Sequence, residues 1–324
     1  MSSSSLSTTS LGVAAGLGTA VLWTITAVCF EAASKRLGSL ATNVLRMVMA
    51  VGLFAVLSLL RSGRLCPPDL SGDAWFYLGL SGLIGFVLGD VFLFKAFVII
   101  GARLSMLIYA SVPLLTALFG FVFLDERMGG RALVGMAMTV AGIAMAVAWK
   151  PGPLSDPARP SPRRTAGILL AIAGSIGQAA GLLLAKRGAI GLDSFAATQI
   201  RVWFGLGGFL LLVLAARQGR ALLGLVGDTL WSSRADSAVD AESRRARRKA
   251  LLVLGVGALL GPFLGVSLGL LSTQLLPTGT ASTLMSIVPV LLIPVTAVAF
   301  HERVAVAEVA GAVLAVSGVA LLAG

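Results

Sequence analysis

Asp90 and Lys95 lie inside a long apolar stretch, where charged side chains are rare and are therefore candidates for function. Successive helical residues are rotated by about 100°, so these two side chains stand about 140° apart and need not pair with each other. A carboxylate at this depth could contact a substrate or carry a proton. Asp90→Asn would then keep substrate binding and remove any dependence on a pH gradient. The alternative is structural: Asp90 bonds a neighbouring helix and Lys95 extends to a polar interface.

Five further side chains are candidates for a substrate cavity. Arg46 and Arg201 each stand near the start of an apolar segment, whereas Trp23, Tyr109 and Gln178 lie within such segments. A guanidinium group there either anchors a helix at an interface or binds an anionic group of a substrate. The aromatic and amide side chains either line a cavity or pack between helices. We place all five with Asp90 and Lys95 as substrate-cavity candidates.

Pro113 and Pro289 each lie inside an apolar segment. A proline in mid-helix removes one backbone hydrogen bond and allows the helix to bend, which would suit gating, although membrane helices also contain prolines as passive kinks. Each proline-containing segment is closed by a Glu-Arg pair, which we interpret as a turn element between helices: Glu126 with Arg127, and Glu302 with Arg303.

These motifs belong to an internal repeat. Pro113 and Pro289 are 176 residues apart, and so are Glu126 and Glu302. The same offset relates five glycines of the first half to five of the second: Gly79, Gly85, Gly89, Gly135 and Gly142 to Gly255, Gly261, Gly265, Gly311 and Gly318. A period of this length is far too long for a solenoid repeat. The sequence therefore indicates one half-protein duplicated.

The composition indicates a membrane protein. Hydrophobic residues make up 57% of the chain and charged residues 12%, against about 25% charged residues in soluble domains. The net charge of +11 comes from basic residues clustered between apolar segments, so we expect contact with the lipid bilayer and no nucleic acid. One histidine, His301, stands next to Glu302, and we expect neither a metal site nor a cofactor.

Ten segments are long enough to span a bilayer as helices. They are 11–32, 40–60, 74–99, 102–124 and 130–149 in the first half, and 165–186, 194–216, 250–273, 277–300 and 304–322 in the second. A Pro-rich linker over 150–164 joins the halves, and a long charged loop over about 217–249 interrupts the second. Because each half has five helices, the second must enter the membrane from the opposite side. This predicts an all-α integral membrane fold of two inverted repeats.

The pattern resembles the EamA repeat of the drug/metabolite transporter superfamily. In the first half the resemblance rests on Trp23, Arg46, Pro113, Glu126, Arg127, Gly135 and Gly142; in the second it rests on Arg201, Pro289, Glu302, Arg303, Gly311 and Gly318. It covers 11–149 as one repeat and 165–322 as the other, although Gly174 stands where Trp23 would align. The resemblance implies a ten-helix transporter of small organic metabolites, often an exporter, with a central cavity and cytoplasmic termini. The basic residues of the loops instead place the termini outside, and the orientation stays open.

The sequence thus predicts a multi-pass transporter of the cell membrane and not an enzyme. It would move a small-molecule substrate by alternating access, as an exporter or exchanger, with protons as a candidate coupling ion and as a monomer or homodimer. One alternative is a non-transporting scaffold or sensor, which would have no cavity between the halves. The other is a membrane-embedded enzyme, which would need paired carboxylates or histidine clusters at membrane depth.

Overall fold

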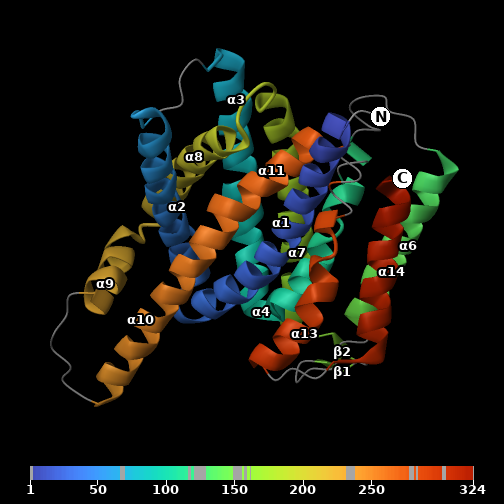
Figure 1. Ribbon diagram of the computed structural model, residues 1–324. Coiled ribbons are helices and arrows are strands. Elements are labelled where there is room, and N and C mark those ends of the chain that lie inside the picture. The colour runs from blue at the N-terminus through green and yellow to red at the C-terminus, as the bar shows by residue number, and fades with distance from the viewer. Residues whose placement is uncertain are drawn as a thin grey trace.

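A computed structural model of the chain consists almost entirely of helices (Figure 1). It describes residues 3–65, 70–115, 118–119, 129–148, 155–156, 159–160, 162–230, 238–276, 281, 284–300 and 304–323. The first half contains α1 (Ser3–Leu37), α2 (Ser39–Ser62), α3 (Gly72–Ser81), the π-helical η1 (Gly82–Gly89), α4 (Asp90–Tyr109) and α6 (Gly130–Ala148). The second contains α7 (Pro162–Gly188), α8 (Ser194–Ala215), α9 (Gly219–Leu230), α10 (Ala238–Ala258), the π-helical η2 (Leu259–Gly265), α11 (Val266–Leu275), α13 (Val288–Phe300) and α14 (Val306–Ala323).

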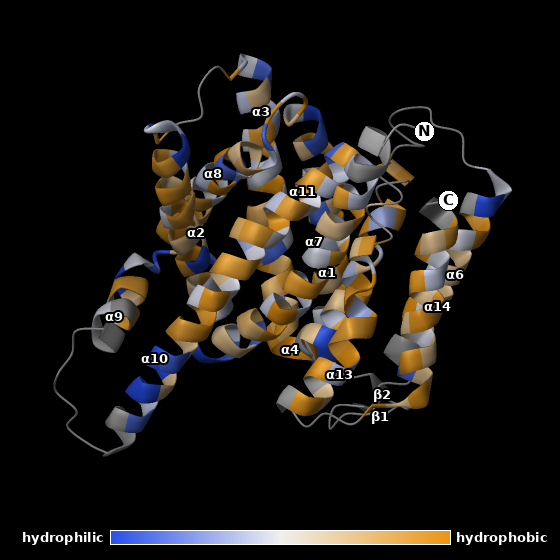
Figure 2. Cartoon of the chain, viewed as in Figure 1, coloured by the Kyte–Doolittle hydropathy of each residue, from blue (hydrophilic) through white to orange (hydrophobic). Residues whose placement is uncertain are grey.

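The helices carry an apolar outer surface suited to lipid. Within the described residues, six helical runs are long and apolar enough to cross a membrane: Thr8–Leu37, Ser39–Ser62, Gly72–Tyr109, Pro162–Gly188, Ser194–Ala215 and Glu242–Leu275. Leu133–Met145 and Val306–Leu321 are shorter apolar helices. Large side chains such as Leu60 and Leu252 are 80% and 74% exposed. Hydrophobic residues cover the middle of the helices, and hydrophilic ones gather near helix ends, most clearly on α10 (Figure 2). The chain is a multi-pass integral membrane protein.

Gly101 separates the two helices that the sequence predicts over 74–99 and 102–124. Its φ of 80° and ψ of 162° break the helical path inside α4, and only glycine adopts such a conformation readily. The helix that follows begins at Ala102, whose backbone N–H donates to Glu31 Oε2 at 2.8 Å. Glu31 is buried in α1 and so supplies an acceptor to a helix start that would otherwise lack one.

The long loop expected over about 217–249 is largely helical where it is described. α9 packs its Leu222 and Leu225 against buried side chains of the core. Helix α10 begins at Ala238, so the basic run from Arg244 to Lys249 belongs to the helix that continues into a spanning segment. The linker also differs from a featureless loop, because Ser155–Asp156 (β1) pairs antiparallel with Arg159–Pro160 (β2). The hydrophobic pattern of the spanning segments could predict neither the helices within the expected loop nor the strand pair within the linker.

Both halves contain a π-helical turn at the same repeat position. η1 ends at Gly89 and η2 at Gly265, which are 176 residues apart in the sequence. In η2, Pro262 lacks the N–H that a regular helix would use there. Such turns often occur at functional sites. The conserved register of the two turns extends the sequence repeat to the backbone conformation.

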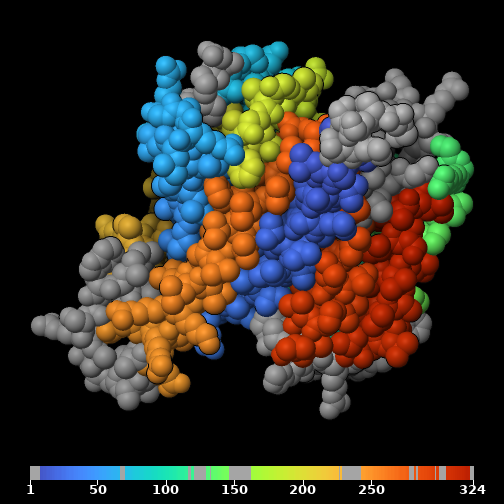
Figure 3. All heavy atoms as spheres, in the orientation of Figure 1, coloured from blue at the N-terminus to red at the C-terminus, as the bar shows by residue number. Residues whose placement is uncertain are grey.

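Each half contributes helices that pack on the other half. Helix α1 contacts α10, η2 and α11, and α7 makes the corresponding contacts with α3, η1 and α4. Helix α2 contacts α8, and α6 contacts α14. In the space-filling view α1 lies in a strip between the surfaces of α10–α11 and of the C-terminal helices (Figure 3). Because the halves are interleaved in this way, the space between them is bounded by helices from both.

The α6–α14 pair makes reciprocal contacts between repeat-equivalent residues. A Cβ atom at Gly142 would lie 2.4 Å from the backbone N of Ala315, and one at Gly318 would lie 2.5 Å from the backbone N of Thr139. Thr139 and Ala315 are themselves separated by 176 residues, and Thr139 Oγ1 donates to the Ala315 carbonyl at 3.3 Å. The late part of α6 thus meets the early part of α14, so the helices run antiparallel (Figure 1).

Candidate functional site

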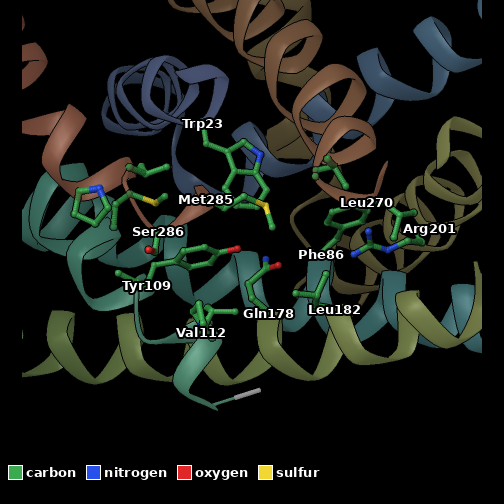
Figure 4. A pocket seen from close by; sticks show the side chains of 17 residues that line it. Trp23, Phe86, Tyr109, Val112, Gln178, Leu182, Arg201, Leu270, Met285 and Ser286 are labelled. Carbon is green, nitrogen blue, oxygen red and sulfur yellow. The ribbon is translucent and has the colours of Figure 1, made fainter. Parts of the chain in front are cut away.

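A cavity lies between the two halves (Figure 4). Its lining comes from α1, η1, α4 and residues 110–113 of the first half and from α7, α8, α11 and residues 285–289 of the second. Six residues singled out from the sequence line it: Trp23, Tyr109, Pro113, Gln178, Arg201 and Pro289. The structure therefore brings together side chains that lie up to 266 positions apart in the sequence.

The two prolines lie just after breaks in their helices rather than in the middle of continuous ones. Residues 110–111 and 286–287 form turns, and helix resumes at Val112 and at Val288, next to Pro113 and Pro289. Proline fits the first turn of a helix because the N–H it lacks would have no partner there. Ala110 and Ser286, within the turns, also line the cavity. The helix breaks next to the two prolines thus lie at equivalent positions of the two halves, and both contribute to the cavity wall.

Aromatic rings form one wall of the cavity. Trp23 and Tyr109 meet edge to face, with ring centroids 6.2 Å apart and an interplanar angle of 83°. The Tyr109 hydroxyl points into the cavity beside the amide of Gln178 (Figure 4). Edge-to-face pairs fix both rings and leave their outer faces free to contact an apolar group. The first repeat alone supplies this pair, since Gly174 stands where the sequence aligns Trp23.

A second cavity adjoins the first. The two share Trp23, Phe86, Met106, Tyr109, Gln178 and Val266 in their linings. Arg46 and Asp90 line only this second cavity, so all but one of the seven candidate residues from the sequence surround one connected space.

Asp90 is paired with Arg46 inside the protein. Arg46 Nη2 and Asp90 Oδ2 form an ion pair whose side chains are only 5% and 7% exposed. Gln178 Nε2 donates to Asp90 Oδ1 at 2.7 Å, and Arg46 Nε donates to Asn43 Oδ1 at 3.0 Å. The guanidinium carbon of Arg46 also lies 4.6 Å from the centre of the Phe94 ring. The two charges therefore compensate each other beside the cavity.

Close packing of glycines places Gln178 against η1. Cβ atoms at Gly177 and Gly181 would lie 2.9 Å and 2.7 Å from the Cα atoms of Gly89 and Gly85. Only glycine lets the backbones of α7 and η1 approach so closely. At this separation Gln178 Nε2 reaches both the Gly85 carbonyl, at 2.9 Å, and the Asp90 carboxylate. Two glycines four residues apart in the sequence thus position a polar contact of the site.

Lys95 lies apart from the other candidates. Its side chain is exposed and lines a separate cavity, bounded by α2, α4, α8 and α9. The partner of Asp90 is Arg46, which stands 44 positions away in the sequence, rather than Lys95 in the same helix. Helix geometry already separates Asp90 from Lys95, but spacing within one segment cannot identify a partner on another.

Arg201 occupies the position in the second half that Arg46 occupies in the first. It is only 4% exposed, and its Nε donates to Ser81 Oγ at 2.9 Å. Its guanidinium carbon lies 4.8 Å from the centre of the Phe86 ring. A Cβ atom at Gly82 would lie 2.2 Å from the Arg201 carbonyl oxygen, so Gly82 permits the close approach of η1 and α8. Among the described residues, no carboxylate forms an ion pair with Arg201.

Further buried charges escaped the sequence analysis. Glu31 joins Lys35 Nζ at 2.5 Å, and Arg103 Nε lies 2.7 Å from Glu308 Oε1 across the two halves. Glu31 could have been recognised from the sequence, because it is a charged residue within the apolar segment 11–32. Arg103 lies at the start of the expected segment 102–124, soon after the break at Gly101, and is 3% exposed. Glu126, Arg127, Glu302 and Arg303 lie outside the described residues.

Comparison with known proteins agrees with this architecture. Residues 10–148 and 165–324 each match the sequence profile described as the EamA-like transporter family. The chain belongs to the EamA-like transporter family. The resemblance drawn from the sequence is therefore confirmed, and this EamA-like protein is a member of a transporter family rather than of an enzyme family.

One solved structure illustrates the fold of the EamA-like chain. It is described as "Crystal structure of protein" and superposes with a TM-score of 0.58 over 96% of each chain at 18% sequence identity. At that identity the likeness extends to the fold alone. The comparison with curated protein sequences gives no match. Within the described residues, no cluster of three or more His, Cys, Asp or Glu side chains could hold a metal ion.

Proposed function

We propose that this EamA-like protein is a secondary transporter of a small organic metabolite, acting as an exporter or exchanger in the cell membrane. The observation that carries the proposal is the central cavity, which is lined by helices of both halves. In a transporter built from two related halves, a site between them can face each side of the membrane in turn as the halves rock. A scaffold or sensor would have no need of such a cavity.

We further propose ten spans arranged as two inverted repeats. A helical stretch is described within each of the ten segments expected from the sequence, with Gly101 separating two of them. The antiparallel contact of α6 with α14, made through Gly142 and Gly318, supports a pseudo-two-fold axis perpendicular to these helices. An axis in that direction lies in the membrane plane, which is the relation that alternating access uses.

Filling the cavity should stop transport without unfolding the protein. Ala110→Trp places a large ring into the cavity wall, whereas Ala137→Trp places the same ring on the exposed side of α6. We expect proteoliposomes with the unchanged protein to take up at least one solute from a panel of small metabolites, with and without a pH gradient. Uptake should fall by more than about tenfold for the cavity variant, an effect of order 1.4 kcal/mol, and stay near normal for the control. Equal uptake by both variants, or none by the folded unchanged protein, would contradict the proposal.

We also propose that Asp90 couples transport to protons. Among the described residues, Asp90 is the sole carboxylate that lines either of the connected cavities. Binding of one proton would cancel its charge and leave Arg46 without its counterion, so the net charge of the space would change by one unit.

The double variant Arg46→Gln with Asp90→Asn tests this coupling without leaving one charge buried alone. We expect it to exchange solute at equal pH on both sides and to lose the acceleration by a pH gradient. The measurement is uptake into proteoliposomes at several imposed gradients. An unchanged dependence on the gradient would assign Asp90 a structural role only.

A further inference from the structure

We propose that Arg201 binds the anionic group of the transported solute, and that the solute is a small monocarboxylate with an apolar body. This inference rests on the proposed transport function and specifies the class of substrate. It comes from a difference between the halves. Arg46 and Arg201 are equivalent residues, both buried and both stacked on a phenylalanine ring, but within the described part of the chain only Arg46 has a carboxylate partner.

One position of the repeat accounts for the lack of a carboxylate partner for Arg201 among the described residues. The repeat offset places Val266 in the second half where Asp90 stands in the first, and Val266 lines the same cavity as Arg201. A buried cation without a counterion is costly, and proteins retain one mainly where a ligand supplies the opposite charge. With Arg46 and Asp90 cancelling, the described side chains that line the connected space carry one net positive charge. The space therefore matches a solute with one net negative charge.

Neighbouring side chains fix the orientation of the Arg201 guanidinium group before a ligand binds. Arg201 Nε donates a hydrogen bond to Ser81 Oγ, which in turn donates to the Gly181 carbonyl at 2.6 Å. The Phe86 ring covers one face of the guanidinium plane, and Arg201 itself lines the central cavity. The two terminal nitrogens then remain for an incoming anion, and paired N–H donors of this kind fit the two oxygens of a carboxylate. Preorganisation lowers the entropy lost on binding.

The remainder of the cavity specifies the body of the solute. Trp23, Met106, Leu182, Leu270 and Met285 give the cavity an apolar lining, and Arg201 is the one cation among its described lining residues. Because Asp90 is already paired, no free carboxylate among the described lining residues can accept an ammonium group. An amine or a zwitterionic amino acid would leave its ammonium group unpaired in an apolar space. The cavity should therefore discriminate by charge among solutes of the same shape.

Three probes with a common phenyl-alkyl body test this discrimination: 3-phenylpropionate, phenethylamine and phenylalanine. Binding to the purified protein is measured by quenching of tryptophan fluorescence, and transport by uptake into proteoliposomes. We expect 3-phenylpropionate to bind at least about tenfold more tightly than either of the others, the scale of one charge-assisted contact. Tighter binding of the amine or the amino acid would overturn the inference. Binding of 3-phenylpropionate without uptake would instead count against transport and leave the anion site standing.

Two variants assign the binding to Arg201. Arg201→Gln removes the charge and should weaken 3-phenylpropionate binding at least about tenfold, whereas Arg61→Gln, at an exposed arginine that is not part of the described cavity lining, should not. Val266→Asp supplies the second half with the carboxylate of the first and should abolish anion binding while the protein stays folded. This second variant decides the matter if Arg201→Gln fails to fold. Unchanged affinity in either folded variant would refute the assignment.

Discussion

Asp90→Asn and Arg46→Gln should each lower the free energy of unfolding by about 3–5 kcal/mol, because each leaves one member of a buried ion pair without its partner. The pair is almost fully enclosed, so water cannot replace the lost partner. The double variant should recover most of the loss, since Gln178 can still donate to an amide oxygen at position 90 and Asn43 can still contact position 46. The measurement is reversible unfolding in detergent micelles, analysed as a double-mutant cycle.

Lys95→Gln is the matched control for this cycle. Lys95 lies closer to Asp90 in the sequence than Arg46 does, but its side chain is exposed and lines another cavity. Removing its charge should change stability by no more than about 0.5 kcal/mol. A large loss for this control, or additive losses in the double variant, would mean that Asp90 is not stabilised chiefly by Arg46.

The sequence predicts the repeat and most of the helices because both depend on local pattern. The apolar segments place α2 and α8 within a few residues of their bounds in the structure. The offset of 176 residues finds Gly142 and Gly318, and the structure uses these glycines as the contact between the fifth helices. The π-helical turns leave no such trace, because one extra residue in a turn does not disturb an apolar segment.

Partners across helices could not be predicted in the same way. Asp90 was selected because charge is rare in apolar segments, which is a property of one segment. Its contacts with Arg46 and Gln178 join residues 44 and 88 positions apart and depend on how closely three helices approach. The approach of α7 to η1 is set by Gly177 and Gly181, whose role appears only once the neighbouring backbone is known. Most of the candidate residues therefore lie around one connected space in the structure, whereas Lys95 lies elsewhere.

Packing at the α6–α14 contact yields the second large expected effect. Gly142→Leu and Gly318→Leu should each prevent recovery of monodisperse protein, because a side chain at either position would meet the backbone of the opposite helix. The milder Gly142→Ala and Gly318→Ala should each cost about 1–3 kcal/mol as the helices move apart. Gly52→Ala in α2, where nothing lies within 4 Å of the added Cβ, should be neutral or stabilise by up to about 1 kcal/mol.

The two alanine variants also test the two-fold relation. A Cβ at Gly142 meets Ala315 and Gly311, and one at Gly318 meets the equivalent Thr139 and Gly135. Related surroundings predict similar losses of stability for the two single variants. Because the first substitution already separates the helices, the second should add less than its own cost, and the double variant should fall short of the sum. Unfolding measured by detergent titration and by thermal melting gives the three values. Strongly unequal single losses would show that the contact is not reciprocal, and the pseudo-two-fold axis would then have to lie elsewhere.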